Sequence, residues 1–444
     1  MQTLERLAPH PIASRAMTGI GVWILWRSSL KLVMELVDAM TQWRNRRSSS
    51  VLLGEGRPMK ITSIRCAAVK DPSMLGRTRT PSASTELQFM NPIASMGPGR
   101  GRASRFEPPW GEAICMVKFD TGDWGVGLTA HAGVVVPLIN DYLGPMILGE
   151  SVTAVDDIVE LWDVMATVLT ANIGIGGVAS YAISAVDLAL YDGLGKRLGA
   201  PVFELLGGPA CRELDCYATG ADVQRLVDFG FTAFKIPCPW PDDSAAAVDR
   251  VVAAFDEACS IAGVDAKVMI DCWAVMDVDA AVRIGEALAP SAPWWIEDYV
   301  SPQDWTGYAA VRAQLPDARL AAGERWFTHE PFRRHAELGT IDVVQPDPLW
   351  VGGATPTVRI AKIAAEHDLD MAIHCAANDA FGQHLAYALK PNTLAEMYIG
   401  AATSLADAYR STPGMAIPVD GVLVPTEAPG FGIELTIDAI EAGT

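Results

Sequence analysis

The sequence predicts an α/β protein, in which a (β/α) barrel follows a smaller strand-rich domain. Between residues 214 and 400, apolar runs typical of buried strands alternate with amphipathic segments typical of helices. Alternation of this kind, with near-continuous apolar strands, indicates a parallel sheet that is covered on both faces. Eight strand–helix units are the number that closes a barrel. Before residue 209 the pattern differs, because strand-like runs come first and two long helical segments follow.

Composition fits a large globular protein and excludes several classes of function. The chain has 444 residues, half of them hydrophobic and a fifth charged, which is enough for a barrel with an added domain. The formal net charge of −19 argues against nucleic-acid partners, because their phosphates would be repelled. No apolar run reaches the roughly 18 residues of a membrane span, so no membrane partner is expected. The eight cysteines include no C-x-x-C motif and predict reduced thiols in a cytoplasmic protein.

Residues 1–58 differ from the rest of the chain because they are basic. They carry eight Lys and Arg against four acids, and Met59 directly after them starts a strand-like alternation. Three interpretations are open at this stage. The segment is an artefact of a start site assigned upstream of Met59, an Arg-rich targeting peptide, or an amphipathic helix that binds a partner. The first interpretation predicts that a chain beginning at Met59 folds with an unchanged melting temperature.

Residues 59–208 are predicted to form the strand-rich domain. Strands are expected at 61–69 and, as a hairpin, within 113–132, and helices are expected at 154–171 and 181–198. The segment Leu75–Pro109 between the strands is rich in Gly, Pro, Ser and Arg. It is long for a plain connection, which predicts either a lid or a disordered segment.

Residues 209–410 are predicted to form the barrel, and residues 411–444 a C-terminal segment. The expected barrel strands lie near 214–220, 231–237, 267–271, 293–298, 320–324, 342–347, 370–375 and 394–400. The clearest amphipathic helices between them are expected at 246–263 and 356–370.

Ionisable residues recur where these strands end. The intervals are one strand–loop–helix unit each, namely 26 residues from Asp271 to Glu297, 27 to Glu324, 23 to Asp347, 27 to His374 and 22 to Glu396. Each of the six side chains is therefore expected at the carboxyl end of its strand, so that all converge at one mouth of the barrel. Barrel enzymes place their active sites at this end.

Three acids on adjacent strands predict a metal site. In a pocket, Asp271, Glu297 and Glu324 could not all stay ionised without a counter-charge, because repulsion and desolvation would raise their pKa values. A set of oxygen ligands suits Mg²⁺, with Mn²⁺ as the alternative, better than it suits zinc. Any one of these acids could simply cap a helix, but three in register favour the metal.

A general base is predicted at the next two positions of the series. A carboxylate that accepts a hydrogen bond from one imidazole nitrogen fixes the tautomer and raises the basicity of the other nitrogen. Asp347 and His374 lie on neighbouring strands and fit this design. Five other histidines lack such a context and are expected to be structural: His131, His329, His335, His367 and His384.

The order of these residues resembles the mandelate racemase branch of the enolase superfamily. That pattern has Asp, Glu and Glu on the third to fifth strands, Asp on the sixth and His on the seventh, and here it extends from Met59 to about Leu435. The resemblance implies an enolase-like fold, with a modified TIM (β/α)7β barrel, an α+β capping domain and a C-terminal segment returning to the cap. It also implies Mg²⁺ on the three acids, acid/base catalysis by His374 with Asp347, and a hydrogen bond from Glu396 to an enediolate.

Short motifs resemble, more narrowly, the L-rhamnonate dehydratase family. They are "CYATGA" (216–221), "KIPCPW" (235–240), "DCW" (271–273), "WIED" (295–298), "GE" (323–324), "QPD" (345–347), "GG" (352–353) and "PGFGIEL" (429–435). This resemblance implies a sugar acid as the substrate, loss of the C2 proton and the 3-hydroxyl, and a 2-keto-3-deoxy acid as the product. It also implies a homo-oligomer.

One departure from the superfamily pattern bears on the reaction. Many relatives carry Lys-x-Lys on the second strand, with the second Lys as a base, whereas here Lys235 is followed by Pro237 in that place. A racemase with a base on each face of the substrate is therefore disfavoured. Lys235 is expected to act electrostatically, and a dehydratase with His374 as its single base is favoured.

Other departures concern the substrate. The dehydratase family typically follows the third metal-ligand Glu with His-His, whereas this chain has Arg325 and Trp326. The family's capping loop carries His-Trp, whereas this chain offers Arg105 within the lid segment. The candidate substrate contacts are therefore Arg105, Arg325 and Trp273.

Two other functions stay open on the sequence alone. The first is an epimerase, racemase or cycloisomerase that uses the same enediolate intermediate, and proton exchange in D₂O without water loss would indicate it. The second is a barrel that has lost catalysis and serves as a binding or structural subunit, which the intact set of core residues disfavours.

Overall fold

The computed structural model describes residues 58–71, 75, 110–239, 245–400, 402–408 and 412–444. Arg57–Thr444 form one compact unit. Two of the predicted segments lie outside the described residues. They are the basic segment 1–58, of which only Pro58 is described, and the lid with Arg105, of which only Leu75 is described.

An antiparallel sheet forms the core of the cap. Its four strands lie in the order β3-β2-β1-β4, and they are β1 (Met59–Ala68), β2 (Glu112–Phe119), β3 (Trp124–Ala130) and β4 (Ser151–Val152). The hairpin expected within 113–132 is the pair β2 and β3, which are joined by a turn that contains Gly122 at φ +87°. The positive φ explains the glycine at this turn, since other residues rarely adopt it.

Helix α6 (Val178–Leu198) packs on strands β2 and β3 of the cap. Its residues from Ala179 to Gly195 are all buried, and eight of these 17 are Ala, Ser or Gly, so the helix lies inside the protein. It ends at Gly199 in the left-handed region, with two basic residues in its last turn, as the stop signals in the sequence predict. The other cap helices are α3 (Ala132–Leu138), a π-helical turn (Ile139–Leu143), α4 (Gly144–Ile147), α5 (Val155–Asn172) and α7 (Val202–Leu205).

Eight parallel strands form the second sheet, in the order β11-β10-β9-β8-β7-β6-β5-β12. They are β5 (Leu214–Thr219), β6 (Ala233–Pro237), β7 (Lys267–Asp271), β8 (Ile296–Glu297), β9 (Leu320–Ala322), β10 (Val343–Val344), β11 (Asp370–Met371) and β12 (Ala395–Tyr398). Every one lies within a run that the sequence predicts as a strand. The predicted fold class, an α/β barrel with an α+β cap, is confirmed.

The two outer strands of this sheet, β11 and β12, meet just before β12 begins. A single bridge joins Met371 to Asn392, and the amide of Thr393 donates a hydrogen bond to the carbonyl of Met371. The sheet therefore curls round and closes through two residues rather than through a regular ladder.

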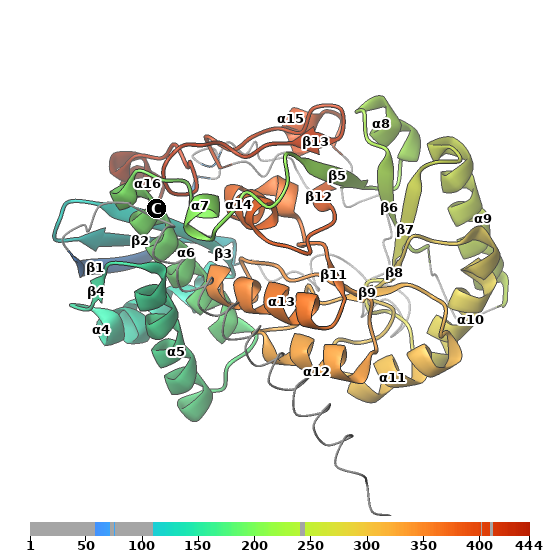
Figure 1. Ribbon diagram of the computed structural model, residues 1–444, viewed down its shortest axis with the longest axis horizontal. Helices are drawn as coiled ribbons and strands as arrows, with labels where there is room; N and C mark the ends of the chain where they lie inside the picture. Colours follow the sequence, from blue (N-terminus) through green and yellow to red (C-terminus); the bar gives the residue numbers. More distant parts are fainter. Residues whose placement is uncertain (1–57, 72–74, 76–109, 240–244, 401, 409–411) are drawn as a thin grey trace, which may run out of the picture. The chain divides into compact units, whose positions relative to one another are not determined.

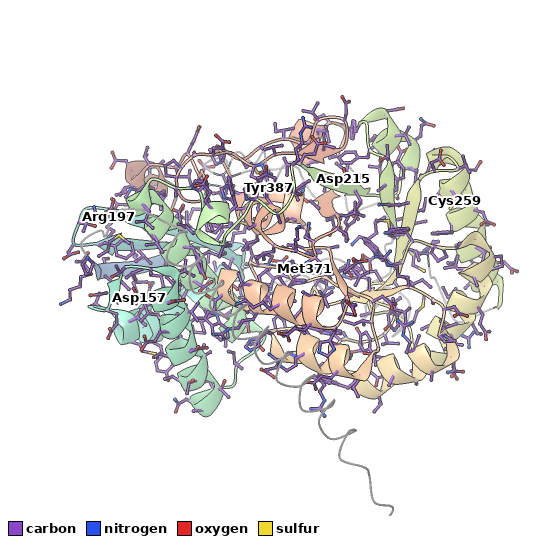
Figure 2. All side chains as sticks on the ribbon, viewed as in Figure 1. Asp157, Arg197, Asp215, Cys259, Met371 and Tyr387 are labelled. Atoms are coloured by element: carbon purple, nitrogen blue, oxygen red, sulfur yellow. The ribbon has the colours of Figure 1, made fainter. Side chains whose placement is uncertain are left out.

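Helices lie outside the strands of the barrel (Figure 1). They are α8 (Val223–Asp228), α9 (Ala245–Ala262), α10 (Val278–Leu288), α11 (Trp305–Gln314), α12 (Glu330–Leu338), α13 (Ala354–Glu366) and α14 (Ala380–Ala388), with 3-10 turns at Ala289–Ser291 and Ala376–Asn378. Figure 2 shows Cys259 on α9 at the outside of the barrel, whereas Asp157 and Arg197 lie on the cap helices α5 and α6.

The interior of the barrel has an apolar layer made of one residue from each strand or from directly beside its end. The members are all buried: Tyr217, Ala233, Met269, Trp295, Ala321, Val343, Ala372 and Leu394. Because side chains alternate along a strand, the residue two positions further on faces the same way, one layer nearer the carboxyl end. These residues form what we call the polar layer: Thr219, Lys235, Asp271, Glu297, Gly323, Gln345, His374 and Glu396. An apolar floor thus supports the chemical groups of the site.

The C-terminal segment contacts both sheets. After α15 (Leu405–Ala408), strand β13 (Val422–Leu423) pairs antiparallel with the start of β5, a pairing that the sequence does not predict. The amide of Phe431 then donates to Asp192 on α6 over 3.0 Å. The amide of Lys70 donates to the carbonyl of Gly443 at the end of α16 (Ile437–Gly443). The segment therefore runs past the barrel and then along the cap.

Within the part of the chain that the structure describes, we find no helix with the length and apolar character that a bilayer span requires.

Candidate active site

The six ionisable residues of the series lie at one end of the barrel but at different positions along their strands. Asp271 and Glu297 are the last residues of β7 and β8. Three others, Glu324, Asp347 and His374, follow the ends of β9, β10 and β11 by two or three residues. Glu396 is the second residue of β12, so the expectation that it ends its strand is wrong. It reaches the same layer because β12 begins close to the floor of the barrel.

Lys235 lies between three of these carboxylates. It is 1% exposed and forms ion pairs with Glu297, with Glu396 (Nζ to Oε1, 2.9 Å) and more distantly with Asp271 (Nζ to Oδ2, 3.8 Å). Burial alone would lower the pKa of Lys235, but the negative charges of Glu297 and Glu396 raise it well above its usual value. These ion pairs stabilise the ammonium form, in which Lys235 holds a positive charge between the acids.

Two neutral side chains complete the surroundings of Glu297. The indole Nε1–H of Trp295 donates to Oε2 of Glu297 over 2.9 Å. The side-chain amide Nε2–H of Gln345 donates to the same oxygen over 2.7 Å. Neither residue was identified from the sequence. The alternation of the strands could have found them, because Trp295 precedes Glu297 by two residues and Gln345 precedes Asp347 by two.

Glu396 accepts hydrogen bonds on both of its oxygens. The hydroxyl of Thr219 donates to Oε1 over 2.5 Å, and the amide of Cys375 donates to Oε2 over 3.0 Å. Burial would raise the pKa of Glu396, but Lys235, His374 and these two donors together lower it to about 2. An ionised carboxylate has no proton to donate. The resemblance implies that Glu396 donates a hydrogen bond to an enediolate. The carboxylate seen here would first have to take up a proton to do so.

His374 and Asp347 form the predicted dyad geometry. The imidazole Nδ1 lies 2.7 Å from Oδ2 of Asp347, and the other oxygen of Asp347 accepts the amide of Leu349 over 2.8 Å. The imidazole Nε2 points to Glu324, 2.9 Å from its Oε2. Burial would lower the pKa of His374, but Cys375, Asp347 and Glu396 raise it well above its ordinary value. A carboxylate thus fixes one nitrogen, and the second nitrogen faces the remaining acids.

Aromatic rings from the cap and the barrel lie beside this dyad. The ring of Trp350 is centred 5.0 Å from the ring of His374, and Tyr181 of α6 lies 5.9 Å from Trp350. Neither aromatic residue was identified as part of the site. The sequence could have indicated Trp350, since it comes three residues after Asp347. Nothing in the sequence indicated Tyr181, because it belongs to another domain.

The candidate substrate contacts Arg325 and Trp273 lie together. The guanidinium of Arg325 is centred 5.7 Å from a ring of Trp273, pairs with Glu324, and approaches Oδ2 of Asp298 to 3.4 Å. The amide of Trp273 donates to Oδ1 of Asp271 over 2.9 Å. Both residues are therefore next to predicted metal ligands, where they can reach a substrate bound there.

The charge of the site fits an added divalent cation. Two permanently charged cations, Lys235 and Arg325, and the His374 ring face six carboxylates: Asp271, Glu297, Asp298, Glu324, Asp347 and Glu396. Oxygen is the donor atom that Mg²⁺ prefers. Glu324 is paired with the guanidinium of Arg325 through Oε1 and faces the imidazole of His374 through Oε2, so a metal ion would replace one of these cations at its carboxylate.

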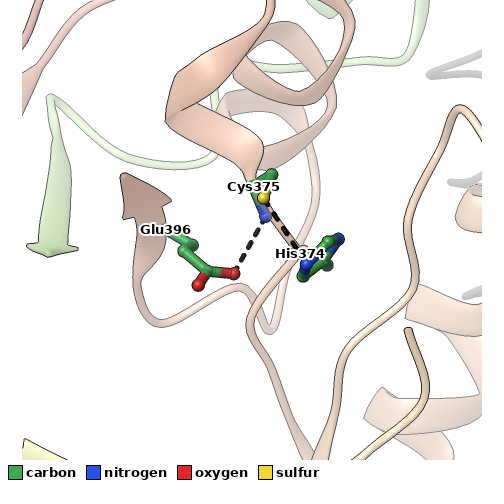
Figure 3. A group of neighbouring side chains, drawn as sticks. All are labelled: His374, Cys375 and Glu396. Atoms are coloured by element: carbon green, nitrogen blue, oxygen red, sulfur yellow. Dashed lines mark hydrogen bonds between the residues drawn. The ribbon is translucent and has the colours of Figure 1, made fainter. Parts of the chain in front are cut away.

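The three predicted ligands are not drawn together as a compact trio. Among the described His, Cys, Asp and Glu side chains, one set of three has possible metal-ligand atoms within 4.8 Å of one another, and that set is His374, Cys375 and Glu396 (Figure 3). Asp271 and Glu297 are paired across β7 and β8, but Lys235 holds Glu297 and Arg325 holds Glu324. Lys235 is shared by Asp271, Glu297 and Glu396, whereas Arg325 pairs with Glu324 and Asp298, so the predicted ligands are divided between two cations.

Comparison with known protein families identifies the chain. Residues 113–207 match the mandelate racemase / muconate lactonizing enzyme N-terminal domain, and residues 218–439 match the enolase C-terminal domain-like family. The chain belongs to the enolase superfamily, as its strand-end residues indicate.

Within this superfamily, the chain is similar to proteins named as L-rhamnonate dehydratases. An L-rhamnonate dehydratase of Saccharopolyspora erythraea is 32% identical over 336 residues, which cover 73% of this chain and 83% of the relative. A protein of Caldivirga maquilingensis that is named as a candidate L-rhamnonate dehydratase is 33% identical over 337 residues. The match covers 74% of this chain and 82% of the relative. The crystal structure of the Gibberella zeae rhamnonate dehydratase complexed with Mg matches with a TM-score of 0.78 at 23% identity. It covers 89% of this chain and 97% of that chain, and at this identity the match supports the fold alone.

Proposed function

We propose that this protein is a Mg²⁺-dependent hydro-lyase that removes water from a sugar acid, with L-rhamnonate as the candidate substrate. The observation that carries the proposal is the placement of His374 and Lys235. Asp347 holds Nδ1 of His374 and its Nε2 lies 2.9 Å from the proposed metal ligand Glu324, whereas Lys235 is enclosed by Glu297 and Glu396. One residue is thus placed to move a proton, and the other is placed to hold a charge. The names of the relatives support the choice of substrate.

Asp271, Glu297 and Glu324 would hold the metal ion. When bound, the ion supplies a Lewis acid that stabilises negative charge on the substrate carboxylate. Mn²⁺ can take the place of Mg²⁺ in this proposal, because the ligands are all oxygen atoms. Homo-oligomeric assembly is a further part of the proposal, and sedimentation of the purified protein tests it.

The proton steps fall to His374. Its Nε2 takes the C2 proton while Asp347 accepts the Nδ1–H bond and stabilises the imidazolium that forms. The imidazolium then gives its proton to the departing 3-hydroxyl. An enol of the 2-keto-3-deoxy acid leaves and becomes the keto product. Trp350, whose ring lies beside the imidazole of His374, helps to exclude water from the base.

The specificity for the sugar is proposed to lie with Arg325, Trp273 and Arg105. Arg325 is a planar donor beside the proposed metal ligands, so it can bind a carboxylate or hydroxyls at the same end of the barrel. If Arg105 also contacts the substrate, Arg105→Ala should change the relative kcat/KM values across several sugar acids.

The direct test is a product assay with Mg²⁺, L-rhamnonate and a panel of stereoisomeric sugar acids. We expect L-rhamnonate to give a 2-keto-3-deoxy acid, chelation to abolish the reaction, and added Mg²⁺ to restore it. Glu297→Gln, which removes one proposed ligand charge, should not be restored by the same Mg²⁺ concentration. Conversion to the C2 epimer without loss of water, or no turnover of any sugar acid, would contradict the proposal.

A further inference from the structure

We propose that His374, Cys375 and Glu396 form a second metal site, which binds a thiophilic divalent cation such as Zn²⁺ and thereby inhibits the enzyme. The inhibition rests on the proposed function, whereas the binding of the metal does not. These three side chains carry one nitrogen, one sulfur and one oxygen ligand, with their ligand atoms within 4.8 Å of one another. Figure 3 shows Cys375 between the other two, with its amide joined to Glu396 and its sulfur joined to His374.

The first two ligand atoms already lie at the spacing that a tetrahedral zinc site needs. Nε2 of His374 lies 3.4 Å from Sγ of Cys375. Zinc–nitrogen bonds of about 2.0–2.1 Å and zinc–sulfur bonds of about 2.3 Å, at the tetrahedral angle, place the two ligands about 3.5 Å apart. The two side chains therefore need little movement to share an ion.

The other nitrogen of the imidazole has the partner that metal-binding histidines usually have. Nδ1 lies 2.7 Å from a carboxylate oxygen of Asp347, which fixes the tautomer and turns Nε2 toward the site. Asp347 is itself held by the amide of Leu349. The ring is thus oriented as a ligand before any metal arrives.

Cys375 is fixed by its own backbone. It lies in the left-handed region, with φ +51°, which is uncommon for a residue with a side chain. In this conformation its amide donates to Oε2 of Glu396 over 3.0 Å while its Sγ lies beside the imidazole. One residue therefore links the other two ligands.

The chemistry of the set distinguishes this site from the proposed Mg²⁺ site. Thiolate and imidazole favour Zn²⁺, whereas Mg²⁺ takes oxygen ligands. On binding, the protons of the thiol and of Nε2 pass to solvent, and the thiolate and the neutral imidazole ligate the ion. The lone pair of Nε2 would then be bound to the metal, so it could not accept the C2 proton.

Co²⁺ absorption gives a readout of metal binding that requires no enzyme activity. With the full-length protein and saturating Mg²⁺, we expect added Co²⁺ to give the near-ultraviolet sulfur-to-cobalt charge-transfer band of a thiolate ligand. Cys375→Ser and Cys375→Ala should lose the band. The matched control is Cys259→Ser, because Cys259 is also a partly buried free thiol but lies on α9 at the outside of the barrel (Figure 2). It should keep the band.

Zinc titration of the dehydratase rate tests the consequence. Each variant is compared with its own rate in Mg²⁺ alone. We expect Cys375→Ser to raise the Zn²⁺ concentration that halves the rate at least about tenfold. Even changes to residues that only hydrogen-bond a ligand alter metal affinity about 10–100-fold. Cys259→Ser should leave it unchanged.

Three results would overturn the proposal: no charge-transfer band in the unaltered protein, a band that survives in both Cys375 variants, or equal zinc sensitivity with and without the thiol. If the band appears as expected but no sugar acid is dehydrated, the metal site stands and the proposed function fails.

Discussion

The two sides of the barrel mouth carry positive charge in different ways. On the Lys235 side, an ammonium ion that is 1% exposed is held by Glu297 and Glu396. On the His374 side, an imidazole that is 12% exposed lies between Asp347 and Glu324. A lysine in this position keeps its proton, whereas an imidazole can release and regain one. This difference is the basis of our proposal that His374 is the base and that Lys235 holds charge.

The largest effect is expected on the His374 side. His374→Asn removes the only group that we place to take the C2 proton, so kcat should fall by about 10²–10⁴ or more. Steady-state kinetics and Mg²⁺ titration check this, and metal and substrate binding should persist because they depend on other residues. A variant that keeps most of its rate would show that the base lies elsewhere.

On the Lys235 side, the main effect of a substitution should be on stability. Lys235→Met leaves Glu297 and Glu396 buried without their cation, which should lower the free energy of unfolding by about 3–5 kcal/mol in the absence of metal. Added Mg²⁺ should recover part of this loss, because the ion supplies positive charge to the same acids. Urea unfolding with and without Mg²⁺ measures both effects. Equal losses under the two conditions would mean that the metal is not bound near Glu297.

The carboxylate of the dyad should matter less than the imidazole. Asp347→Asn keeps the ring of His374 but removes the charge that holds Nδ1, so kcat should fall about 10–100-fold, as for other outer partners of a functional histidine. The control is the rate of His374→Asn, which should be lower. If the order of the two rates were reversed, Asp347 would have a direct role that the geometry does not give it.

The cap supports the loop that carries Asp347. The hydroxyl of Thr129 donates to the carbonyl of Leu349, and the indole of Trp162 donates to the carbonyl of Gly352. Asp187 on α6 accepts the amide of Thr355 over 2.9 Å and its hydroxyl over 2.7 Å, at the start of α13. Gly353 leaves room for this carboxylate, since a Cβ there would lie 2.4 Å from Oδ2 of Asp187. The His374 side thus depends on contacts between two domains.

The smallest effect is expected from Asp187→Asn. The variant should lose about 1–3 kcal/mol of stability, because a buried hydrogen bond is left imperfect, and its kcat should fall a few-fold without a change in KM. Asp192→Asn is the control, since Asp192 is also buried on α6 but accepts the amides of Val126 and Phe431 and pairs with Lys196, away from the Asp347 loop. It should lose comparable stability and keep its kcat. Equal changes in kcat for both variants would remove Asp187 from any positioning role.

The fold and the six ionisable positions were predictable because both follow from short-range regularities. Apolar strands and helices alternate along the chain, and one polar group recurs per unit, so spacing alone places Asp271, Glu297 and His374 at the same end. The alternation within strands would also have indicated Trp295 and Thr219. Two residues in each strand, or directly beside its end, then suffice to define the floor and the polar layer.

The remaining features of the site depend on contacts that the sequence does not encode locally. Asp187 meets Thr355 across 168 positions of the chain, and nothing near either residue indicates the other. The pairing of Lys235 with Glu396 depends on the strand order that brings β12 beside β5. The left-handed backbone of Cys375, which turns its thiol toward His374, is likewise not indicated by the residue type.

Exchange of the C2 proton in D₂O, followed by proton NMR with Mg²⁺ and the sugar acid present, tests the single-base account most directly. His374→Asn should show neither exchange nor dehydration, since one imidazole serves both steps. Lys235→Met, measured where Mg²⁺ keeps it folded, should exchange the proton at a reduced rate. If Lys235→Met stopped the exchange while His374→Asn retained it, the base would lie on β6, and the assignment of the two sides of the barrel would be contradicted.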